Sequence, residues 1–167
     1  MNESHFNKLK QIRALVLDVD GVLTDGGLYM NNSEMGRKMN IKDGFAIKEF
    51  LSFGYPIFII SGSGSDSIKT RLTGLGIKEV HLYQKNKLDC FKHLSNKYKL
   101  NEKHVAFIGD DIPDLELMKL VGFKACPADA CKEIRQIADY TSLYKGGEGC
   151  FREIIEFILK LQGAWNY

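Results

Sequence analysis

The chain has 167 residues, of which 44% are hydrophobic and 26% are charged, and this composition is typical of one globular domain. Its 23 basic and 21 acidic side chains leave a formal net charge of +2, which is too balanced to predict binding to nucleic acid or an anionic membrane. The N-terminal residues are polar and no apolar run is long enough to span a bilayer, so we expect a cytoplasmic protein. The four cysteines have no zinc-like spacing, which favours reduced thiols.

Short apolar runs alternate with longer amphipathic runs along the chain. In order, we expect a strand at 14–17, a hairpin at 27–41 with its turn at Asn31-Asn32, a helix at 44–53, a strand at 56–60, a helix at 65–75, a strand at 79–82, a helix at 87–99, a strand at 105–108, a helix at 113–120, a strand at 123–126, and helices at 130–137 and 149–161. This alternation predicts an α/β fold in which a doubly wound, mainly parallel sheet carries helices on both faces. No repeat or linker interrupts it, so we expect a single domain over residues 1–167.

Four polar clusters each follow one of the predicted strands. In chain order they are Asp18-Val-Asp20-Gly21, Ser61-Gly62, Lys87 after a loop, and Asp110-Asp111 with Asp114. Ligands of doubly wound sheets bind beyond the carboxyl ends of the strands. We therefore expect the four clusters to converge at one edge of the sheet.

The first and last clusters predict a metal site. Asp18 and Asp20 lie two positions apart after a strand, so both carboxylates can face the same side. Carboxylates gathered in one small site repel each other unless a cation is present, and hard oxygen ligands suit Mg²⁺. A metal would also keep Asp18 ionised for attack on phosphorus. Asp110 is the expected ligand from the last cluster, while Asp111 and Asp114 would orient Lys87 or metal-bound water. Capping of a helix N-terminus is the alternative for one of these acids.

The two middle clusters predict a phosphate site. A hydroxyl and exposed backbone N–H groups at Ser61-Gly62 can hold phosphate oxygens, although the same residues would also suit a plain strand–helix turn. Lys87 at the start of a helix can neutralise a transferring phosphoryl group. A solvated surface lysine is the alternative for Lys87, and Lys85 is its rival for the role.

The order of these clusters resembles the haloacid-dehalogenase superfamily of phosphatases, with the match covering residues 13–160. The resemblance implies a Rossmann-like core and an Mg²⁺ cofactor. It implies that Asp18 attacks phosphorus to form an aspartyl-phosphate and that Asp20 is the general acid and then the general base. The metal ligands would be Asp18, the backbone carbonyl of Asp20, and Asp110, while Ser61, Gly62 and Lys87 would hold the phosphoryl oxygens.

Spacing narrows the resemblance to a branch without a cap domain. The stretch from Asp18 to Ser61 has room only for the hairpin, as a small flap, and one helix, and the stretch from Ser61 to Lys87 holds one helix and one strand. The chain is similar to the capless branch that acts on sugar-acid phosphates, on the evidence of segments such as Lys42-Asp43-Gly44, Cys126-Pro-Ala-Asp-Ala130 and Gly146-Gly-Glu-Gly149. The C-terminal segment Leu159–Gly163 resembles 3-deoxy-D-manno-octulosonate 8-phosphate (KDO 8-phosphate) phosphatases of lipopolysaccharide sugar synthesis.

That branch implies a homotetramer in which a neighbouring subunit is the lid of the active site. The hairpins would pack at the tetramer centre, and the loop near Gly146 would approach a neighbouring site. Arg71 and Arg152 would contact substrate or a partner subunit, although a solvated helix arginine and a local ion pair of Arg152 with Glu148 or Glu153 are the alternatives. The tail from Ala164 would either dock on a neighbour or fray.

Three other functions compete with this one. A phosphatase of the same branch that acts on KDN 9-phosphate differs in having a glutamate where this chain has Ser63, which favours the eight-carbon substrate. A phospho-receiver signalling domain also uses acids, a hydroxyl and a lysine, but in another order along the chain. A catalytically silent scaffold would not need all the chemical groups that are present.

Overall fold

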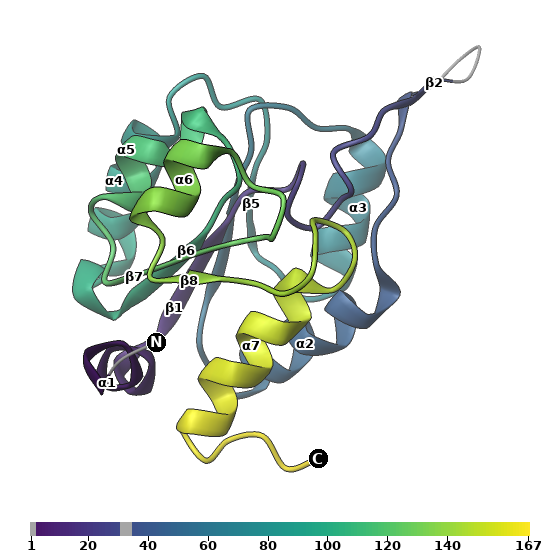
Figure 1. Cartoon of the computed structure of the whole chain (residues 1–167). Helices are drawn as coiled ribbons and strands as arrows, with labels where there is room; N and C mark the ends of the chain where they lie inside the picture. Colours follow the sequence, from purple (N-terminus) through teal and green to yellow (C-terminus); the bar gives the residue numbers. More distant parts are fainter. Residues whose placement is uncertain (1–2, 31–34) are drawn as a thin grey trace.

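The central sheet has six strands, all paired in parallel, in the order β5-β4-β1-β6-β7-β8 (Figure 1). The computed structural model describes residues 3–30 and 35–167. The strands are β1 Ala14–Leu17, β4 Ile57–Ile60, β5 Glu79–His81, β6 Val105–Ile108, β7 Phe123–Cys126 and β8 Tyr140–Thr141. The chain runs outward from β1 through β4 to β5 and then returns to β6 on the other side of β1. The strand order therefore reverses beside β1, which is where a doubly wound sheet forms its ligand crevice.

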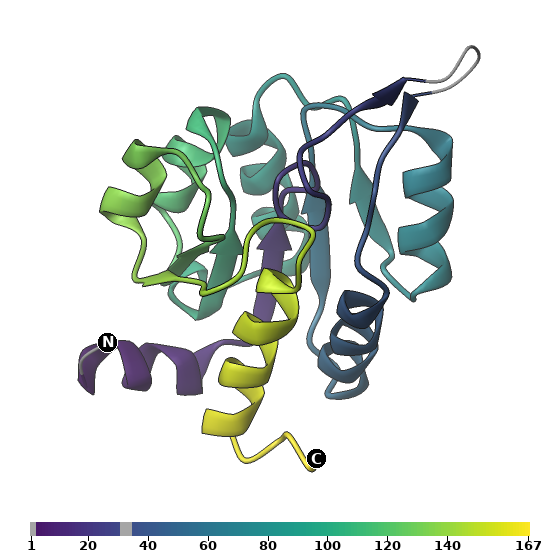
Figure 2. The same cartoon turned by 45° about the vertical axis from the view of Figure 1, so that its right-hand side comes forward.

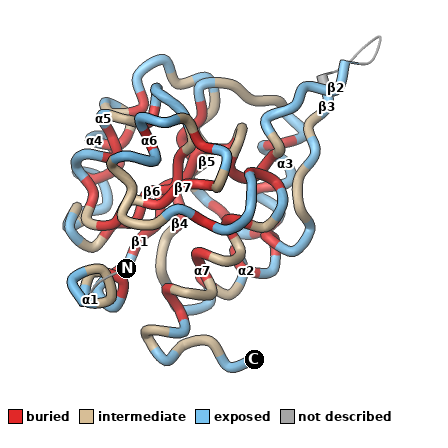
Figure 3. Tube along the Cα trace, viewed as in Figure 1, coloured by how far each residue is buried: buried red, intermediate tan, exposed pale blue. Residues whose placement is uncertain are grey.

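Helices cover both faces of this sheet, as the alternating pattern predicts. The helices α1 Glu3–Gln11, α2 Ile41–Ser52, α3 Asp66–Gly74 and α7 Cys150–Leu161 pack on one face, and α4 Lys87–Tyr98, α5 Leu115–Met118 and α6 Lys132–Ile137 pack on the other. Side chains of β1 alternate between the two cores, with Leu15 and Leu17 in the first and Ala14 and Val16 in the second. Figure 3 shows that the buried residues follow the central strands. The predicted fold class is confirmed.

Several element boundaries differ from those expected. The helix predicted at 44–53 begins at Ile41, because the Asn40 side chain accepts the Lys42 N–H at 3.0 Å and caps the first turn. The helix predicted at 113–120 starts as a 3₁₀ turn, η2 Ile112–Asp114, before α5. Three short elements were not predicted: α1, η1 Glu102–His104 and β8.

The first of these missed elements is a polar helix with one buried side chain, Leu9. An ion pair of 2.9 Å between Lys8 Nζ and Asp139 Oδ1 also ties α1 to the residue before β8. Such a helix depends on a docking site elsewhere in the chain, so its own periodicity is too weak to predict it.

A small hairpin separates β1 from α2. Its strands, β2 Tyr29–Met30 and β3 Met35–Gly36, pair in antiparallel fashion, and the expected turn at Asn31-Asn32 lies outside the described residues. Figure 2 shows this flap projecting from the body, at the end of the molecule opposite the tail that follows α7. Among the described residues, no other element lies between β1 and β4 except α2, and only α3 lies between β4 and β5, so neither stretch holds a cap domain.

Two observations bear on the expected cytoplasmic location and on the expected reduced thiols. Within residues 3–30 and 35–167, no helix has the length and apolar character needed to cross a membrane. Cys90, Cys126, Cys131 and Cys150 are all free thiols. The single-domain assignment over residues 1–167 stays a prediction.

Candidate active site

The predicted polar clusters meet at one open cavity of about 310 Å³ beyond the carboxyl ends of β1, β4 and β6. The cavity is lined by Asp18, Asp20, Gly21, Gly26, Ser61, Gly62, Ser63, Lys87, Asp110, Asp111 and Pro113. A larger hollow of about 530 Å³ near Arg152 is also lined by acids and a lysine, but it contains no residue of the four polar clusters. The meeting of the predicted clusters, and not the volume, therefore identifies the smaller cavity as the candidate active site.

Lys87 lies at the centre of the buried part of the cavity. Its Nζ is 2.8 Å from Asp18 Oδ2 and 2.6 Å from Asp114 Oδ1, and its side chain is 4% exposed. Burial alone would lower the pKa of Lys87, but the charges of Asp114 and Asp18 raise it above its usual value, so the ammonium stays charged. The rival Lys85 is exposed and does not line the cavity, so of the two lysines only Lys87 is available to a ligand there.

Asp114 holds the loop after β6 together. One of its oxygens accepts the Lys87 ammonium, and the other accepts the backbone N–H of Asp110 at 3.0 Å and of Asp111 at 3.4 Å. Asp114 is fully buried, whereas Asp111 is exposed at the cavity rim. Of the two acids that the sequence left equivalent, Asp114 is thus the one that orients Lys87.

The acids around Lys87 have the donor chemistry of a magnesium site. Carboxylate oxygens of Asp18, Asp110 and Asp114 lie within 4.8 Å of one another, and the buried Oδ1 of Asp110 has no hydrogen-bond partner. Burial and the charges of Asp18 and Asp114 raise the pKa of Asp110 to about 8. Burial and the charge of Asp114 raise the pKa of Asp18 to about 6, against the lowering effect of Lys87. A divalent cation among these oxygens would offset that repulsion, so the residues fit the group.

Gly21 allows Asp110 to lie close to the backbone of the first cluster. Its φ is +80°, a backbone conformation that favours glycine, and a Cβ at this position would lie 2.0 Å from Asp110 Oδ2. The glycine of the first cluster is therefore required both by the turn and by the close approach of Asp110.

Asp20 faces the flap instead of the buried acids. Its Oδ1 accepts Arg37 Nε at 2.7 Å and Thr24 Oγ1 at 3.3 Å, and its Oδ2 accepts the Ser63 hydroxyl in a short hydrogen bond. Arg37 Nη2 also donates to Ser63 Oγ at 3.1 Å. Sequence reasoning missed Arg37, because a single arginine in a hairpin carries no motif. In the sequence, Ser63 bears only on the choice between the two sugar-acid substrates, and its contact with Asp20 is not predicted.

Ser61 and Gly62 form the wall between Asp18 and the flap side. The Ser61 N–H donates to His81 O and its carbonyl accepts Gln84 N–H, both at 2.9 Å, so the loops after β4 and β5 are bonded together. Gly62 is exposed, and a Cβ there would meet only Gln84 O, at 3.8 Å. A hydroxyl and an open backbone segment thus face the cavity beside Lys87.

Comparison with known proteins gives the family. The sequence pattern of the haloacid dehalogenase-like hydrolases matches residues 65–154. The chain is 38% identical over 157 residues to 3-deoxy-D-manno-octulosonate 8-phosphate phosphatase KdsC of Escherichia coli (strain K12). The aligned residues cover 93% of this chain and 84% of that protein. This chain belongs to the haloacid dehalogenase-like hydrolases.

Solved structures agree with this membership of the haloacid dehalogenase-like hydrolases. The phosphatase of the same name from Yersinia pestis superposes with a TM-score of 0.95 at 32% identity, covering 98% of this chain and 89% of that one. The Moraxella catarrhalis phosphatase, in complex with a magnesium ion, a phosphate ion and a KDO molecule, gives a TM-score of 0.93 at 34% identity, covering 98% and 94%. The predicted family resemblance is confirmed, and the chain is an enzyme of the phosphoric monoester hydrolase class.

Two arginines lie outside the cavity of this haloacid dehalogenase-like hydrolase. Arg71 is exposed on α3, and its guanidinium lies near Gly44 of α2, where an added Cβ would come 2.9 Å from Arg71 Nη2. Arg152 on α7 pairs with Glu156, one turn away, and not with Glu148 or Glu153. Within one chain, neither arginine is placed to contact a ligand at Asp18.

The C-terminal tail packs against its own chain. The Arg152 guanidinium lies over two rings, 5.0 Å from the centroid of Phe45 and 5.1 Å from that of Trp165. Tyr167 also contacts Phe45 edge-on, with ring centroids 5.3 Å apart. The tail therefore packs on α2 and α7 of its own chain, at the end of the molecule away from the flap (Figure 2).

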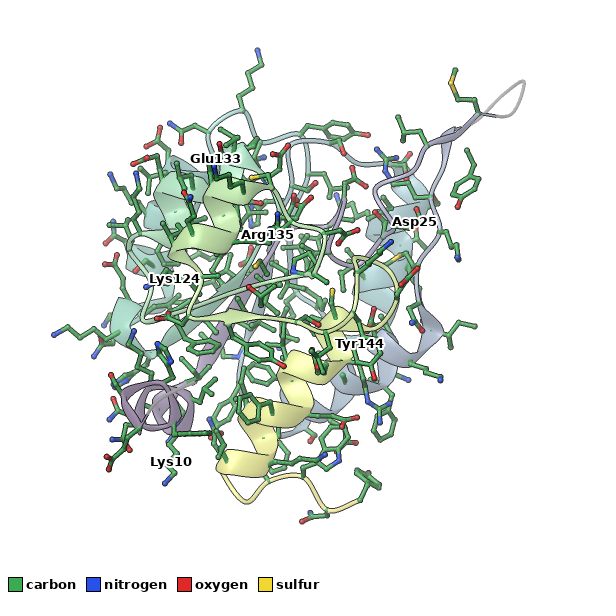
Figure 4. All side chains as sticks on the ribbon, in the orientation of Figure 1. Lys10, Asp25, Lys124, Glu133, Arg135 and Tyr144 are labelled. Carbon is green, nitrogen blue, oxygen red and sulfur yellow. The ribbon has the colours of Figure 1, made fainter. Side chains whose placement is uncertain are left out.

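The glycine-rich loop before α7 contacts the first polar cluster of the same chain. The Gly147 N–H donates to Val22 O at 3.0 Å, and a Cβ at Gly146 would lie 1.9 Å from Gly21 O. The backbone of Asp25 lies beside Gly147, and the Asp25 side chain accepts the Tyr29 hydroxyl at 2.7 Å. Figure 4 labels Asp25 and also Tyr144, which precedes the glycine-rich loop. The loop expected to approach a neighbouring site thus first supports the Gly21 turn of its own chain.

Proposed function

We propose that this enzyme hydrolyses 3-deoxy-D-manno-octulosonate 8-phosphate to KDO and phosphate, with Mg²⁺ as its cofactor. The observation that carries the proposal is Asp18, held at the end of β1 with its carboxylate 2.8 Å from Lys87 and open to the cavity. A carboxylate beside a cation that can take up phosphoryl charge is the arrangement needed for nucleophilic attack on phosphorus. The names of the similar phosphatases support the substrate.

Asp18 and Asp110 would hold the Mg²⁺ ion, together with the backbone carbonyl of Asp20. The unpartnered buried oxygen of Asp110 and the raised pKa values of both acids support this ligand set. When bound, the ion would neutralise phosphoryl charge and keep the Asp18 carboxylate ionised. Asp114 is bonded to Lys87 and to the backbone of the 110–111 loop, and so would orient Lys87 and Asp110 without binding the ion itself.

The reaction would take two displacements. In the first, Asp18 forms a bond to phosphorus, the ester P–O bond breaks, and Asp20 gives its proton to the sugar oxygen. In the second, Asp20 takes a proton from a water molecule that attacks phosphorus, the Asp18–phosphorus bond breaks, and phosphate leaves. Lys87, the Ser61 hydroxyl and the Gly62 N–H would hold the phosphoryl oxygens throughout.

The enzyme would work as a homotetramer in which a neighbouring subunit covers the cavity. Two structural features support this assembly. The cavity is open, and no cap domain covers it within residues 3–30 and 35–167. The described part of the flap exposes the apolar residues Leu28, Tyr29 and Met30, with Met30 83% exposed. We place the enzyme in the cytoplasm, where its product would enter lipopolysaccharide sugar synthesis.

KDN 9-phosphate is the main alternative substrate, because the same chemistry would act on another sugar-acid phosphate. Ser63 lines the cavity where a glutamate would mark that activity, and this favours the eight-carbon substrate. A phospho-receiver domain is the alternative outside the enzymes, but the family membership argues against it.

Phosphate release tests these choices directly. We would measure kcat/KM with MgCl₂ for KDO 8-phosphate, KDN 9-phosphate and several common sugar phosphates, with an EDTA-treated sample as the control. We expect KDO 8-phosphate to give by far the highest value and EDTA to abolish turnover. A preference for KDN 9-phosphate would overturn the substrate alone, whereas a stable phospho-Asp18 without turnover would overturn the phosphatase.

A further inference from the structure

Arg37 connects the flap to the half of the cavity that holds Asp20. It follows β3 directly, and its side chain is 8% exposed although it belongs to a projecting hairpin. The guanidinium uses two of its nitrogens: Nε donates to Asp20 Oδ1 at 2.7 Å, and Nη2 donates to Ser63 Oγ at 3.1 Å. Ser63 in turn donates to the other oxygen of Asp20. Three groups from three chain segments thus form a closed ring of hydrogen bonds.

This ring fixes the direction in which the Asp20 carboxylate points. The Asp20 side chain is 31% exposed, so packing alone leaves it free to rotate into solvent. Donors on both oxygens, with Thr24 as a further donor to Oδ1, restrict that rotation. The planar fork of an arginine holds its hydrogen-bond partners in a defined orientation, which an ammonium group on a flexible stem does less well.

Arg37 itself does not reach the phosphate position. Among the described residues, it is absent from the lining of the cavity, whereas Asp20 and Ser63 both line it. Arg37 therefore acts on the reaction by orienting Asp20 and not by direct contact with the phosphoryl group.

We propose that Arg37 is a positioning residue, which, with Ser63, aims the Asp20 carboxylate at the oxygen of the leaving group. The inference rests on the proposed phosphatase function, in which Asp20 protonates that oxygen. A general acid contributes only when it is held within hydrogen-bond reach of its target, and a displacement of about 1 Å can cost 10²-fold in rate. The flap would then determine how well proton transfer proceeds, in addition to any role in covering the site.

Two esters with different leaving groups test the inference. A sugar alkoxide needs a proton as it leaves, whereas p-nitrophenolate leaves readily without one. We would measure kcat and KM for KDO 8-phosphate, or the best alkyl phosphate found, and for p-nitrophenyl phosphate, with Arg37→Ala, Arg37→Lys, Ser63→Ala and Asp20→Asn. Lys38→Ala is the matched control, because Lys38 is the adjacent flap cation and is exposed.

We expect Arg37→Ala to lower kcat/KM for the alkyl phosphate about 10- to 100-fold and for p-nitrophenyl phosphate less than about 3-fold. The comparison uses kcat/KM because this ratio reports the first displacement, whereas kcat also contains the hydrolysis of the aspartyl-phosphate, in which Asp20 is the base for both esters. Asp20→Asn should show the same selectivity with a larger loss, and Ser63→Ala and Arg37→Lys should show smaller losses. Lys38→Ala should match the unsubstituted enzyme on both esters.

Equal losses of kcat/KM on the two esters would overturn the positioning role and indicate that Arg37 supports the fold or phosphate binding. A rise in KM without a fall in kcat would overturn it also, in favour of substrate binding. If the unsubstituted enzyme hydrolyses neither ester, the proposed function fails and the Arg37 inference fails with it. The two failures are distinguishable, because the first leaves the unsubstituted enzyme active.

Discussion

The two halves of the active-site cavity are built in different ways. On one side, Lys87 lies between Asp18 and Asp114 with almost no exposure, and every partner comes from the end of a sheet strand or the helix or turn that follows it. On the other side, Arg37 pairs with the partly exposed Asp20, and the arginine comes from a projecting flap. Both halves are ion-paired networks of similar hydrogen-bond length. They differ in the burial of their acids and in the elements that support them.

This difference has an energetic consequence. Removing one partner from a buried pair leaves an uncompensated charge and is costly, whereas an exposed pair is weakened by water and salt. The buried half should therefore be needed for both folding and chemistry, while the flap half should affect the reaction with little effect on stability. That separation would suit the proposed reaction, in which the nucleophile Asp18 is held in place while the acid Asp20 faces the substrate.

The largest expected effect is on turnover when the nucleophile is removed. Asp18→Asn should lower kcat by about 10⁴-fold or more, because Asp114 is bonded to Lys87 and Asp110 would be a metal ligand, so neither replaces the nucleophile. Steady-state phosphate release measures this loss, and circular dichroism checks that the fold is intact. Asp25→Asn, in the same loop but at the flap side, is the control and should keep most of its turnover. Substantial activity in Asp18→Asn would refute the nucleophile assignment.

The stability of the two halves can be compared directly. Lys87→Met should reduce the free energy of unfolding by about 3–5 kcal/mol, because it leaves Asp18 and Asp114 buried without their cation. Arg37→Ala should cost about 1 kcal/mol or less, because Asp20 stays partly in water. Urea unfolding of both variants beside the unsubstituted enzyme measures the two values. Similar losses would contradict the distinction between the halves.

Asp43 shows the effect of burying an acid without a cation bonded to it. It is 2% exposed, its Oδ1 accepts the Arg152 N–H at 3.0 Å, and its Oδ2 has no partner. Burial raises the pKa of Asp43 to about 6 from an ordinary value of 3.8. The folded state thus binds this proton more tightly than the unfolded state, so the contribution to stability is fully present below about pH 4 and is lost as the pH rises through about 6.

Asp43→Asn removes this titration while keeping an oxygen for the Arg152 N–H. The stability of the variant relative to the unsubstituted enzyme should therefore increase between about pH 4 and pH 6, by up to about 3 kcal/mol, since each pKa unit is worth about 1.4 kcal/mol. Urea unfolding at several pH values measures the difference, and Glu116→Gln, at an exposed acid, should show no such trend. A constant difference across this range would argue against a raised pKa in the folded state.

The smallest expected effect concerns the metal in the buried half. MgCl₂ at about 100 times its dissociation constant should stabilise the unsubstituted enzyme by about 2.7 kcal/mol, and Asp110→Asn should lose most of that gain. Thermal unfolding with and without MgCl₂ measures it independently of catalysis, and Glu116→Gln is again the control. An unchanged magnesium response in Asp110→Asn would remove Asp110 from the ligand set.

Most of the sheet and the buried half of the cavity were predictable from local patterns. Apolar runs such as 14–17 and 105–108 matched β1 and β6, because a central parallel strand is apolar on both faces. Asp18, Ser61 and Asp110 then meet because parallel topology brings the carboxyl ends of neighbouring strands to one edge. The helix α1 and the short strand β8 escaped prediction, because each depends on contacts with distant segments.

What the amino-acid order could establish alone was the chemistry: which acids, hydroxyl and lysine follow which strands, and hence the family and reaction type. The folded chain decided how those groups pair. It selected Lys87 over Lys85, buried Asp114 and left Asp111 at the rim, turned Arg152 toward its own tail, and brought Arg37 onto Asp20. These choices depend on which side chains from distant segments share one buried space, and neither spacing nor periodicity along the chain encodes that.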